Sequence, residues 1–319
     1  MRSNCLIHAA AALLLGIPSG SGCDLCAIYA AGQARGEVGQ GPFVGLGEQF
    51  THYGTLQYEG HEVANPADQS LDSSITQVLV GYNVSERFGL QLNLPFIYRS
   101  FRRPEASAIH EGTESGIGDG VLLATHEVMR FERRHSTFVW SVLAGVKFPT
   151  GSTSRLREET QEGAGQEGPI ASGIHGHDLT LGSGSYDGLV GTSAYARRDR
   201  LFLTGTVQYA IRSRGDYDYR FANDFIWSAA PGYLVLLSED YTLSVEANVS
   251  GEVKGRDEFR GQAAEDTGIL AVYVGPQLVF TWHDKISAQV ALDWPGLRDN
   301  TALQIVPDYR IRAGLTWRF

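Results

Sequence analysis

The most reactive pair of side chains in the sequence is Cys23 and Cys26, in the segment CDLC. In an oxidising compartment, cysteines at this spacing form a local disulfide or exchange with the thiols of a partner protein. Attachment of c-type haem requires a histidine directly after the second cysteine, and Ala27 stands there instead. We therefore predict a disulfide or redox role for Cys23 and Cys26 and no haem.

A second candidate ligand set is the pair His175 and His177, in the segment HGH. Thiolates and imidazoles together bind soft metal ions, so this pair could complete a site with Cys23 and Cys26. The two pairs are distant in the sequence, and the histidines lie in a long polar connection, where exposed loop residues are the ordinary interpretation. We predict neither a resident metal nor a cofactor.

Hydrolysis would require a serine, a histidine and a carboxylate or amide that converge, with the serine activated by its base. His126, Ser141 and Ser193 are the residues of the right types, but none lies in a GxSxG nucleophile elbow. The sequence therefore favours a protein that is not an enzyme, with an outer-membrane hydrolase as the weaker alternative.

The first 22 residues have the order of a secretory signal peptide. Met1 and Arg2 are followed by an apolar run at 9–17 and by small residues at 18–22. No later stretch reaches the roughly 18 consecutive apolar residues that a membrane helix needs. After cleavage, Cys23 and Cys26 are the only cysteines. We predict export, so the mature chain either stays in the periplasm or crosses a membrane as strands.

The elements that must position any functional side chain are β-strands. In the last eleven residues, 309–319 (YRIRAGLTWRF), every second residue is apolar and the chain ends on Phe319. A strand has a side-chain period of two, so this segment has one apolar face, as the closing strand of an outer-membrane barrel does. The same alternation is clear at 88–98, 138–148, 270–282 and 286–294. At 44–52, 121–129 and 187–197 the pattern does not show dependably which residues share the apolar face. Aromatic residues that would form the two interfacial girdles are Phe88, Tyr98, Trp140, Phe148, Trp282, Trp294 and Trp317.

The connections between these strands alternate in length. Short ones are predicted at 83–87, 131–136, 197–200, 238–241 and 283–285, and long ones at 54–73, 101–115, 151–178, 213–223, 254–266 and 296–302. A soluble sandwich, the alternative, has no reason to sort its loops in this way. We predict an all-β fold, a transmembrane antiparallel β-barrel of about twelve strands over residues 43–319, with short periplasmic turns and long extracellular loops.

If the apolar faces meet lipid, the opposite faces line the interior. The predicted lumen-lining residues are Gln91, Asn93, Arg99, Lys147, Arg212, Glu246, Asp293, Arg310 and Arg312. Mixed charge inside a barrel of this size has two interpretations. One is a narrow polar pore whose field orients a solute, and the other is a ladder of ion pairs that fills the barrel.

Three glycine-containing motifs occur between residues 115 and 188: SGIGDG, KFPTG and LGSGSYDG. Their distinctive positions are Gly116, Gly118, Asp119, Pro149, Gly151, Gly182 and Gly184. We expect the alternating glycines to open one face of a strand to the close approach of a loop or plug, and Gly182 and Gly184 to begin the next strand. The GIGDG spacing lacks the context of a dinucleotide fold.

In their order and spacing, these motifs resemble the outer-membrane transporters of the MetA-pathway of phenol degradation family. The resemblance extends weakly over residues 43–319. It implies an outer-membrane β-barrel that admits small solutes, often aromatic or hydrophobic, and it carries over no catalytic residues.

Together these observations predict a channel for passive uptake in the bacterial outer membrane. Residues 23–42 form a periplasmic leader or plug, and a structural barrel with a filled lumen is the alternative function. The partners we expect are outer-membrane lipid, a small solute and the outer-membrane assembly machinery, which reads the C-terminal strand ending in Phe319. The net charge of −10 argues against nucleic acid.

Overall fold

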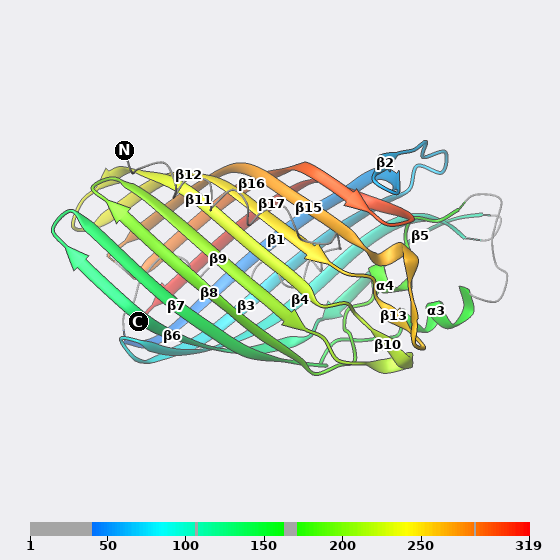
Figure 1. The fold of residues 1–319 in the computed structure, drawn as a ribbon, viewed down its shortest axis with the longest axis horizontal. Coiled ribbons are helices and arrows are strands. Elements are labelled where there is room, and N and C mark those ends of the chain that lie inside the picture. Colours follow the sequence, from blue (N-terminus) through cyan, green and yellow to red (C-terminus); the bar gives the residue numbers. More distant parts are fainter. Residues whose placement is uncertain (1–39, 106–107, 163–170, 284) are drawn as a thin grey trace, which may run out of the picture.

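The computed structural model describes residues 40–105, 108–162, 171–283 and 285–319, and twelve antiparallel strands close into one barrel (Figure 1). The wall strands are β1 (Gly41–Tyr58), β3 (Ser70–Ser85), β4 (Phe88–Glu105), β6 (Gly120–Arg133), β7 (Ser136–Phe148), β8 (Asp187–Arg198), β9 (Leu201–Ile211), β11 (Asp224–Leu237), β12 (Tyr241–Lys254), β15 (Ile269–Trp282), β16 (Ile286–Asn300) and β17 (Leu303–Arg318). The predicted fold class and strand number are confirmed.

Closure is made by the first and last wall strands. β1 pairs with β17 from Phe43 opposite Arg318 to Tyr58 opposite Leu303, and every other wall strand pairs with its neighbours along the chain. Closing the sheet removes its edges, so every wall strand has a partner on both sides. Among the described residues, no helix combines the length and the apolar character needed to span a bilayer.

All five short turns are where the sequence predicts them. Two or three residues separate the strands at each of these turns, as between Arg198 and Leu201. Figure 1 shows these turns at the end of the barrel that holds the carboxyl terminus. The opposite, extracellular end carries α3 (Leu156–Glu162), α4 (Gly176–Leu179), η2 (Asp216–Asp218), η3 (Glu265–Thr267) and the short strands β2 (His61–Glu62), β10 (Tyr219–Arg220), β13 (Glu258–Phe259) and β14 (Gln262–Ala263).

Three of the predicted long loops are wrong in extent. Much of 101–115 is strand, because β4 continues to Glu105 and β5 (Ala108–Ile117) pairs with it; most of 296–302 is strand; and 54–73 is strand at both ends. The ladders continue beyond the lipid, where an outward side chain need no longer be apolar. At these positions the alternation is lost because the outward side chains meet water instead of lipid, although the strands continue.

The strand between β4 and β7 is interrupted. β5 pairs with the extracellular half of β4 and β6 pairs with the periplasmic half, and the break between them is at Gly118 and Asp119. The amide of Gly118 still donates to the carbonyl of Pro95 at 2.8 Å. β5 and β6 thus follow one path along β4, with a kink at the SGIGDG motif.

The outer and inner faces of the wall follow the predicted alternation. Along β4, for example, Leu92, Leu94 and Phe96 are exposed to the lipid side, and Asn93 and Ile97 are buried on the inner side. Two of the segments without a dependable phase, in β6 and β8, carry apolar residues on both faces. The third, in β1, carries Glu48 on its outer face, where Ser74 and Thr76 donate hydrogen bonds to it.

Candidate functional site

The structure places all nine predicted lumen residues on the inner face of the wall. Seven are buried, and Gln91 and Arg312 are half-buried. Few of them project freely, because most are held by charged partners or by backbone carbonyls. Six of them fall into two groups on different parts of the wall. Of the other three, Gln91 donates a hydrogen bond to Asn93 on β4, and Arg99 binds backbone carbonyls of the connection between β7 and β8.

The first group is a chain of alternating charges near the extracellular ends of β6 to β11. The ammonium of Lys147 lies 2.8 Å from Asp119 and 2.7 Å from Asp187. The guanidinium of Arg212 lies 3.0 Å from Asp187 and pairs with Asp224 through its Nε at 3.1 Å. All five side chains are at most 5% exposed, so each charge depends on its neighbours for compensation.

This charge chain joins the three glycine-containing motifs. Asp119, from SGIGDG, accepts hydrogen bonds from the amide of Gly151 at 3.0 Å and from the amide and hydroxyl of Ser183 at 2.9 and 2.7 Å. Lys147 and Gly151 belong to KFPTG, and Ser183 and Asp187 to LGSGSYDG. Residues far apart in the sequence therefore meet at one carboxylate, which sequence reasoning did not foresee.

The motif glycines permit close approach. A Cβ on Gly118 would lie 3.2 Å from the carbonyl oxygen of Leu181, and one on Gly151 would lie 2.5 Å from it. The prediction that Gly182 and Gly184 begin a strand is wrong, because β8 starts at Asp187. Gly184 instead turns the chain with a φ of +69°, which favours glycine, beside Asp216. Pro149 follows the last residue of β7.

The second group lies on β12, β15, β16 and β17. Asp293 accepts from the guanidinium of Arg312 at 2.7 Å and from the amide of Asn248 at 3.0 Å. Arg310 lies 3.7 Å from Glu252 and stacks over the ring of Tyr273 at 4.0 Å. Gln277 donates to Glu246 at 3.2 Å. This part of the lumen is therefore polar and largely compensated in charge.

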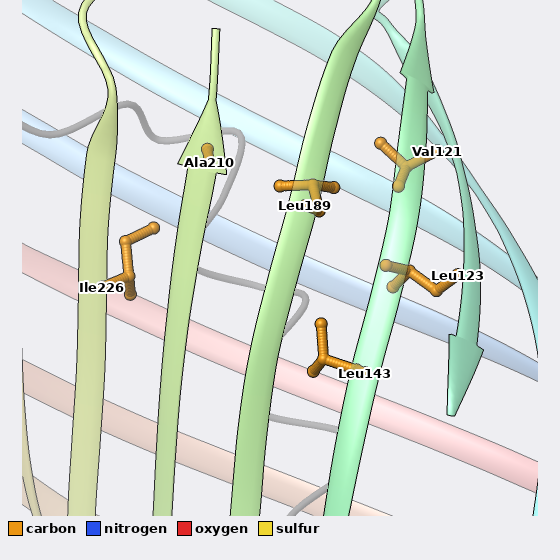
Figure 2. Packing of buried hydrophobic residues seen from close by; sticks show 6 residues of the cluster. All are labelled: Val121, Leu123, Leu143, Leu189, Ala210 and Ile226. Carbon is orange, nitrogen blue, oxygen red and sulfur yellow. The ribbon is translucent and has the colours of Figure 1, made fainter. Parts of the chain in front are cut away.

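On the periplasmic side of the charge chain the inner wall has an apolar cluster. Figure 2 shows six buried side chains contributed by the consecutive strands β6, β7, β8, β9 and β11. They are Val121, Leu123, Leu143, Leu189, Ala210 and Ile226. Sequence reasoning missed this surface, although a signal existed: where both faces of a strand are apolar, alternation disappears. We call these six residues the apolar wall.

Part of the connection between β7 and β8 folds back into the extracellular half of the lumen, which corrects the prediction of a wholly external loop over 151–178. Its backbone is held by side chains of the wall. Arg99 donates to the carbonyls of Asp178 and Thr180 at 2.5 and 2.6 Å, and Gln69 donates to Ala171 at 3.1 Å. We call residues 171–185 the inner segment.

Apolar contacts fix the inner segment as well. Ile174 and Leu179 pack against Leu71, Phe101 and Ile305. Leu181 packs against Ile75 and Ile97 from β3 and β4. These inward residues of the wall are covered by the chain itself, so the inner segment narrows the extracellular mouth of the barrel.

His177 anchors the inner segment on the extracellular side. Its Nδ1 lies 3.0 Å from Glu159 of α3, and its ring stacks on His175 and on Tyr219 of β10. Burial alone would lower the pKa of His177, but the carboxylates of Asp178 and Glu159 outweigh burial and raise that pKa well above 6.5. Asp266 of η3 lies 3.3 Å from His175. Burial opposes ionisation of Asp266, but the charges of His177 and His175 prevail and lower its pKa.

The candidate hydrolase residues do not converge. His126 points outward from β6, whereas Ser141 and Ser193 are opposite each other on the inner faces of β7 and β8. Across the described ranges, no three His, Cys, Asp or Glu side chains are grouped so that they could hold a metal ion. The predictions for Cys23 and Cys26, for the signal peptide and for most of the leader concern residues outside those ranges.

Comparison with known sequences gives no assignment: no family model matches the chain, and no curated protein does. The resemblance to the MetA-pathway family thus stays a prediction from the motifs.

Comparison with solved structures gives the fold. The chain is similar to the COG4313 outer membrane channel from Pseudomonas putida F1, with 16% sequence identity, a TM-score of 0.58 and coverage of 90% of this chain and 98% of that one. Weaker likenesses are to the β domain of the Bordetella autotransporter BrkA (10% identity, TM-score 0.43, 88% and 99% coverage) and to the CymD monoaromatic hydrocarbon channel (9%, 0.40, 95% and 95%). At these identities the likeness is one of fold, and the fold is that of an outer-membrane β-barrel.

Proposed function

We propose that this protein is an outer-membrane channel for the passive uptake of small solutes with apolar, including aromatic, bodies. The observation that carries the proposal is the apolar wall. A barrel that is only a scaffold has no need for an apolar cluster across five strands of its inner face, whereas such a cluster provides a surface for a molecule that water solvates poorly. A channel of this kind requires no catalytic residue, in line with the prediction that the protein is not an enzyme.

The second candidate is a structural barrel with a filled lumen. It is favoured by the inner segment, which packs under the extracellular mouth, and by the two groups of compensated charges. The channel requires a continuous path for the solute beside the inner segment, and the filled barrel has no such path.

The proposed location is the bacterial outer membrane, reached through the signal peptide at 1–22 and the assembly machinery. The C-terminal pairing supports recognition of β17, because Trp317 and Phe319 stack at 5.3 Å beside the closing seam. We propose that the leader at 23–42, which precedes β1 in the sequence, plugs the barrel from the periplasmic end. Its last residues enter β1, which begins at Gly41.

Single-channel conductance of the refolded protein in a planar bilayer tests the channel. We expect a steady conductance, which rises when residues 23–39 are removed if the leader is a plug. Heat-modifiable gel mobility shows that each sample is folded. If neither the full protein nor the protein without residues 23–39 conducts although both are folded, the filled scaffold is favoured.

A further inference from the structure

Three buried glutamines on the inner wall lack any partner in the described part of the chain. Gln49 and Gln77 are 0% exposed and Gln208 is 1% exposed, yet neither amide atom of any of the three makes a hydrogen bond there. The hydroxyls of Thr51, Ser73 and Thr206 are likewise buried and without a hydrogen-bond partner in the described ranges. Burying a polar group without a partner costs free energy, so such groups are rare unless they serve another molecule.

The three glutamines lie at a similar depth in the lumen, with Thr51 and Ser73 nearer its extracellular end and Thr206 nearer its periplasmic end. Counted from the periplasmic end of its strand, Gln49 is eight residues beyond Gly41, Gln77 is eight from Ser85, and Gln208 is seven from Leu201. With a rise of about 3.3 Å per residue and a tilt of about 40°, all three lie about 20 Å from the periplasmic rim. We call the three glutamines with Thr51, Ser73 and Thr206 the amide belt.

The belt has two sides that face each other. On β1 and β3, Thr51 is directly opposite Ser73, and Gln49 and Gln77 both lie on the periplasmic side of this pair, opposite Ile75 and Gly47. β9 follows β1 by six places in the ring of twelve strands, so Gln208 lies across the lumen from Gln49. Gln208 is also directly opposite Ile226, a member of the apolar wall. Hydrogen-bonding groups and an apolar surface therefore adjoin at this depth.

The chemistry of the belt specifies the polar group of its ligand. A carboxamide both donates and accepts, a hydroxyl does the same, and neither carries charge. The nearest cations on this side, Arg310 and Arg312, are already paired with Glu252 and Asp293. A neutral hydroxyl or amide on the solute therefore matches the belt better than a carboxylate does.

We propose that the amide belt is the selection site of the channel, where a solute with an apolar body and a neutral hydroxyl or amide group is held by the glutamines while its body lies on the apolar wall. This inference rests on the proposed channel function and adds the solute class. It gives a reason for the unpaired amides, because the solute supplies the partners that the barrel lacks.

The test compares three probes on the full exported protein in detergent: benzyl alcohol, toluene, which lacks the hydroxyl, and benzoate, which is charged. Affinities are measured by saturation-transfer NMR for the wild type, Gln77→Leu and Gln208→Leu. The matched control is Gln289→Leu, an inner-face glutamine only three residues from the periplasmic end of β16. Thr206→Val, which keeps the shape of the side chain, provides a second variant should a leucine variant fail to fold.

We expect the wild type to prefer benzyl alcohol over both other probes. Each belt variant should bind benzyl alcohol about 5- to 10-fold more weakly, the usual effect of removing one hydrogen bond, and should bind toluene as before. The control should keep the wild-type preference. Equal affinities for benzyl alcohol in the wild type and the belt variants would overturn the proposal.

Two further readouts separate the alternatives. If the belt instead binds the leader, its variants would leave probe affinities unchanged and, after reduction of any disulfide, speed the reaction of Cys23 and Cys26 with a maleimide. This result would also overturn the proposal. Conductance is recorded in parallel. A conducting protein without the hydroxyl preference would refute the selection site alone, whereas the preference without conductance would refute the channel and leave the binding site standing.

Discussion

The two sides of the lumen are built on the same kind of wall and do different things. From β6 to β11 the inner face carries the apolar wall together with Thr206 and Gln208 of β9, and the charge chain of Asp119, Lys147 and their partners lies at its extracellular end. From β12 through β17 to β3 the inner face is polar, with compensated charges and unpaired amides. The comparison indicates that the outer face is set by lipid, while the inner face is free to vary and carries the function.

The largest effect is expected at the charge chain. Lys147→Met leaves Asp119 and Asp187 buried without their shared cation, and breaking a buried pair costs about 3–5 kcal/mol. The loss should appear as a lower midpoint of unfolding in heat-modifiable gel mobility, and as a larger and noisier conductance, because the inner segment loses the hydrogen bond from Lys147 to Ser183.

Arg102→Met is the control for this prediction, since it breaks an exposed pair with Glu111. An unchanged midpoint in Lys147→Met would contradict the structural role assigned to the charge chain.

The next largest effect is expected on the apolar wall. Leu189→Asn replaces a buried apolar contact by an amide, and losing one leucine contact is worth about 1.5–3 kcal/mol, or roughly tenfold or more in affinity. Toluene binding should weaken accordingly, as measured by saturation-transfer NMR. Leu203→Asn, on the lipid face of β9, should leave toluene binding unchanged in protein that folds. Equal weakening in both variants would show that the probe reports on the detergent-facing surface and not on the lumen.

A smaller effect is expected from pH at the inner segment. His177 has a folded-state pKa above its unfolded value, so its stabilising ion pairs are fully present below about pH 6.5 and are lost as pH rises through the raised pKa. The groups facing it are Glu159, Asp178, Asp266, His175 and Tyr219. Conductance should therefore become noisier when the extracellular side is made alkaline.

The stabilisation contributed by Asp266 depends on pH in the opposite direction. Its pKa is lowered on folding, so its contribution is present above its unfolded pKa of 3.8 and is lost as pH falls through the lower, folded-state value. The noise in the conductance should therefore be lowest between the acidic and the alkaline pH ranges. His177→Phe should abolish the alkaline effect and weaken the acidic one, because the charge of His177 is the main one that lowers the pKa of Asp266. An alkaline effect of the same size in that variant would point to another group.

The outer half of this structure is readable from the sequence, and the inner half mostly is not. Lipid imposes apolar residues at every second position, which is why β4, β7, β15 and the closing strand β17 are found by alternation alone. The inner face obeys no such rule. At Leu123 and Leu189 the inner face is apolar, so the apolar–polar alternation disappears. The strands there could be located, but their residues could not be assigned to the inner or the outer face.

The inner segment was missed for another physical reason. Its main anchors are bonds from Arg99 and Gln69 to backbone carbonyls, and every residue has a carbonyl, so no side-chain pattern marks the acceptors. The meeting of the three motifs at Asp119 depends on the order in which strands close the barrel. Their glycines were recognised as sites of close approach, but the partner was visible only in the fold.

The most direct test of the central claim is the initial rate at which intact cells take up labelled naphthalene, with the outer membrane as the barrier. Cells producing the protein are compared with cells lacking it and with cells producing Leu143→Gln/Leu189→Gln at the same surface level. We expect faster uptake with the wild type and a return toward the background rate with the double variant. Uptake that is the same in all three would contradict the claim that the apolar wall carries a solute through the barrel.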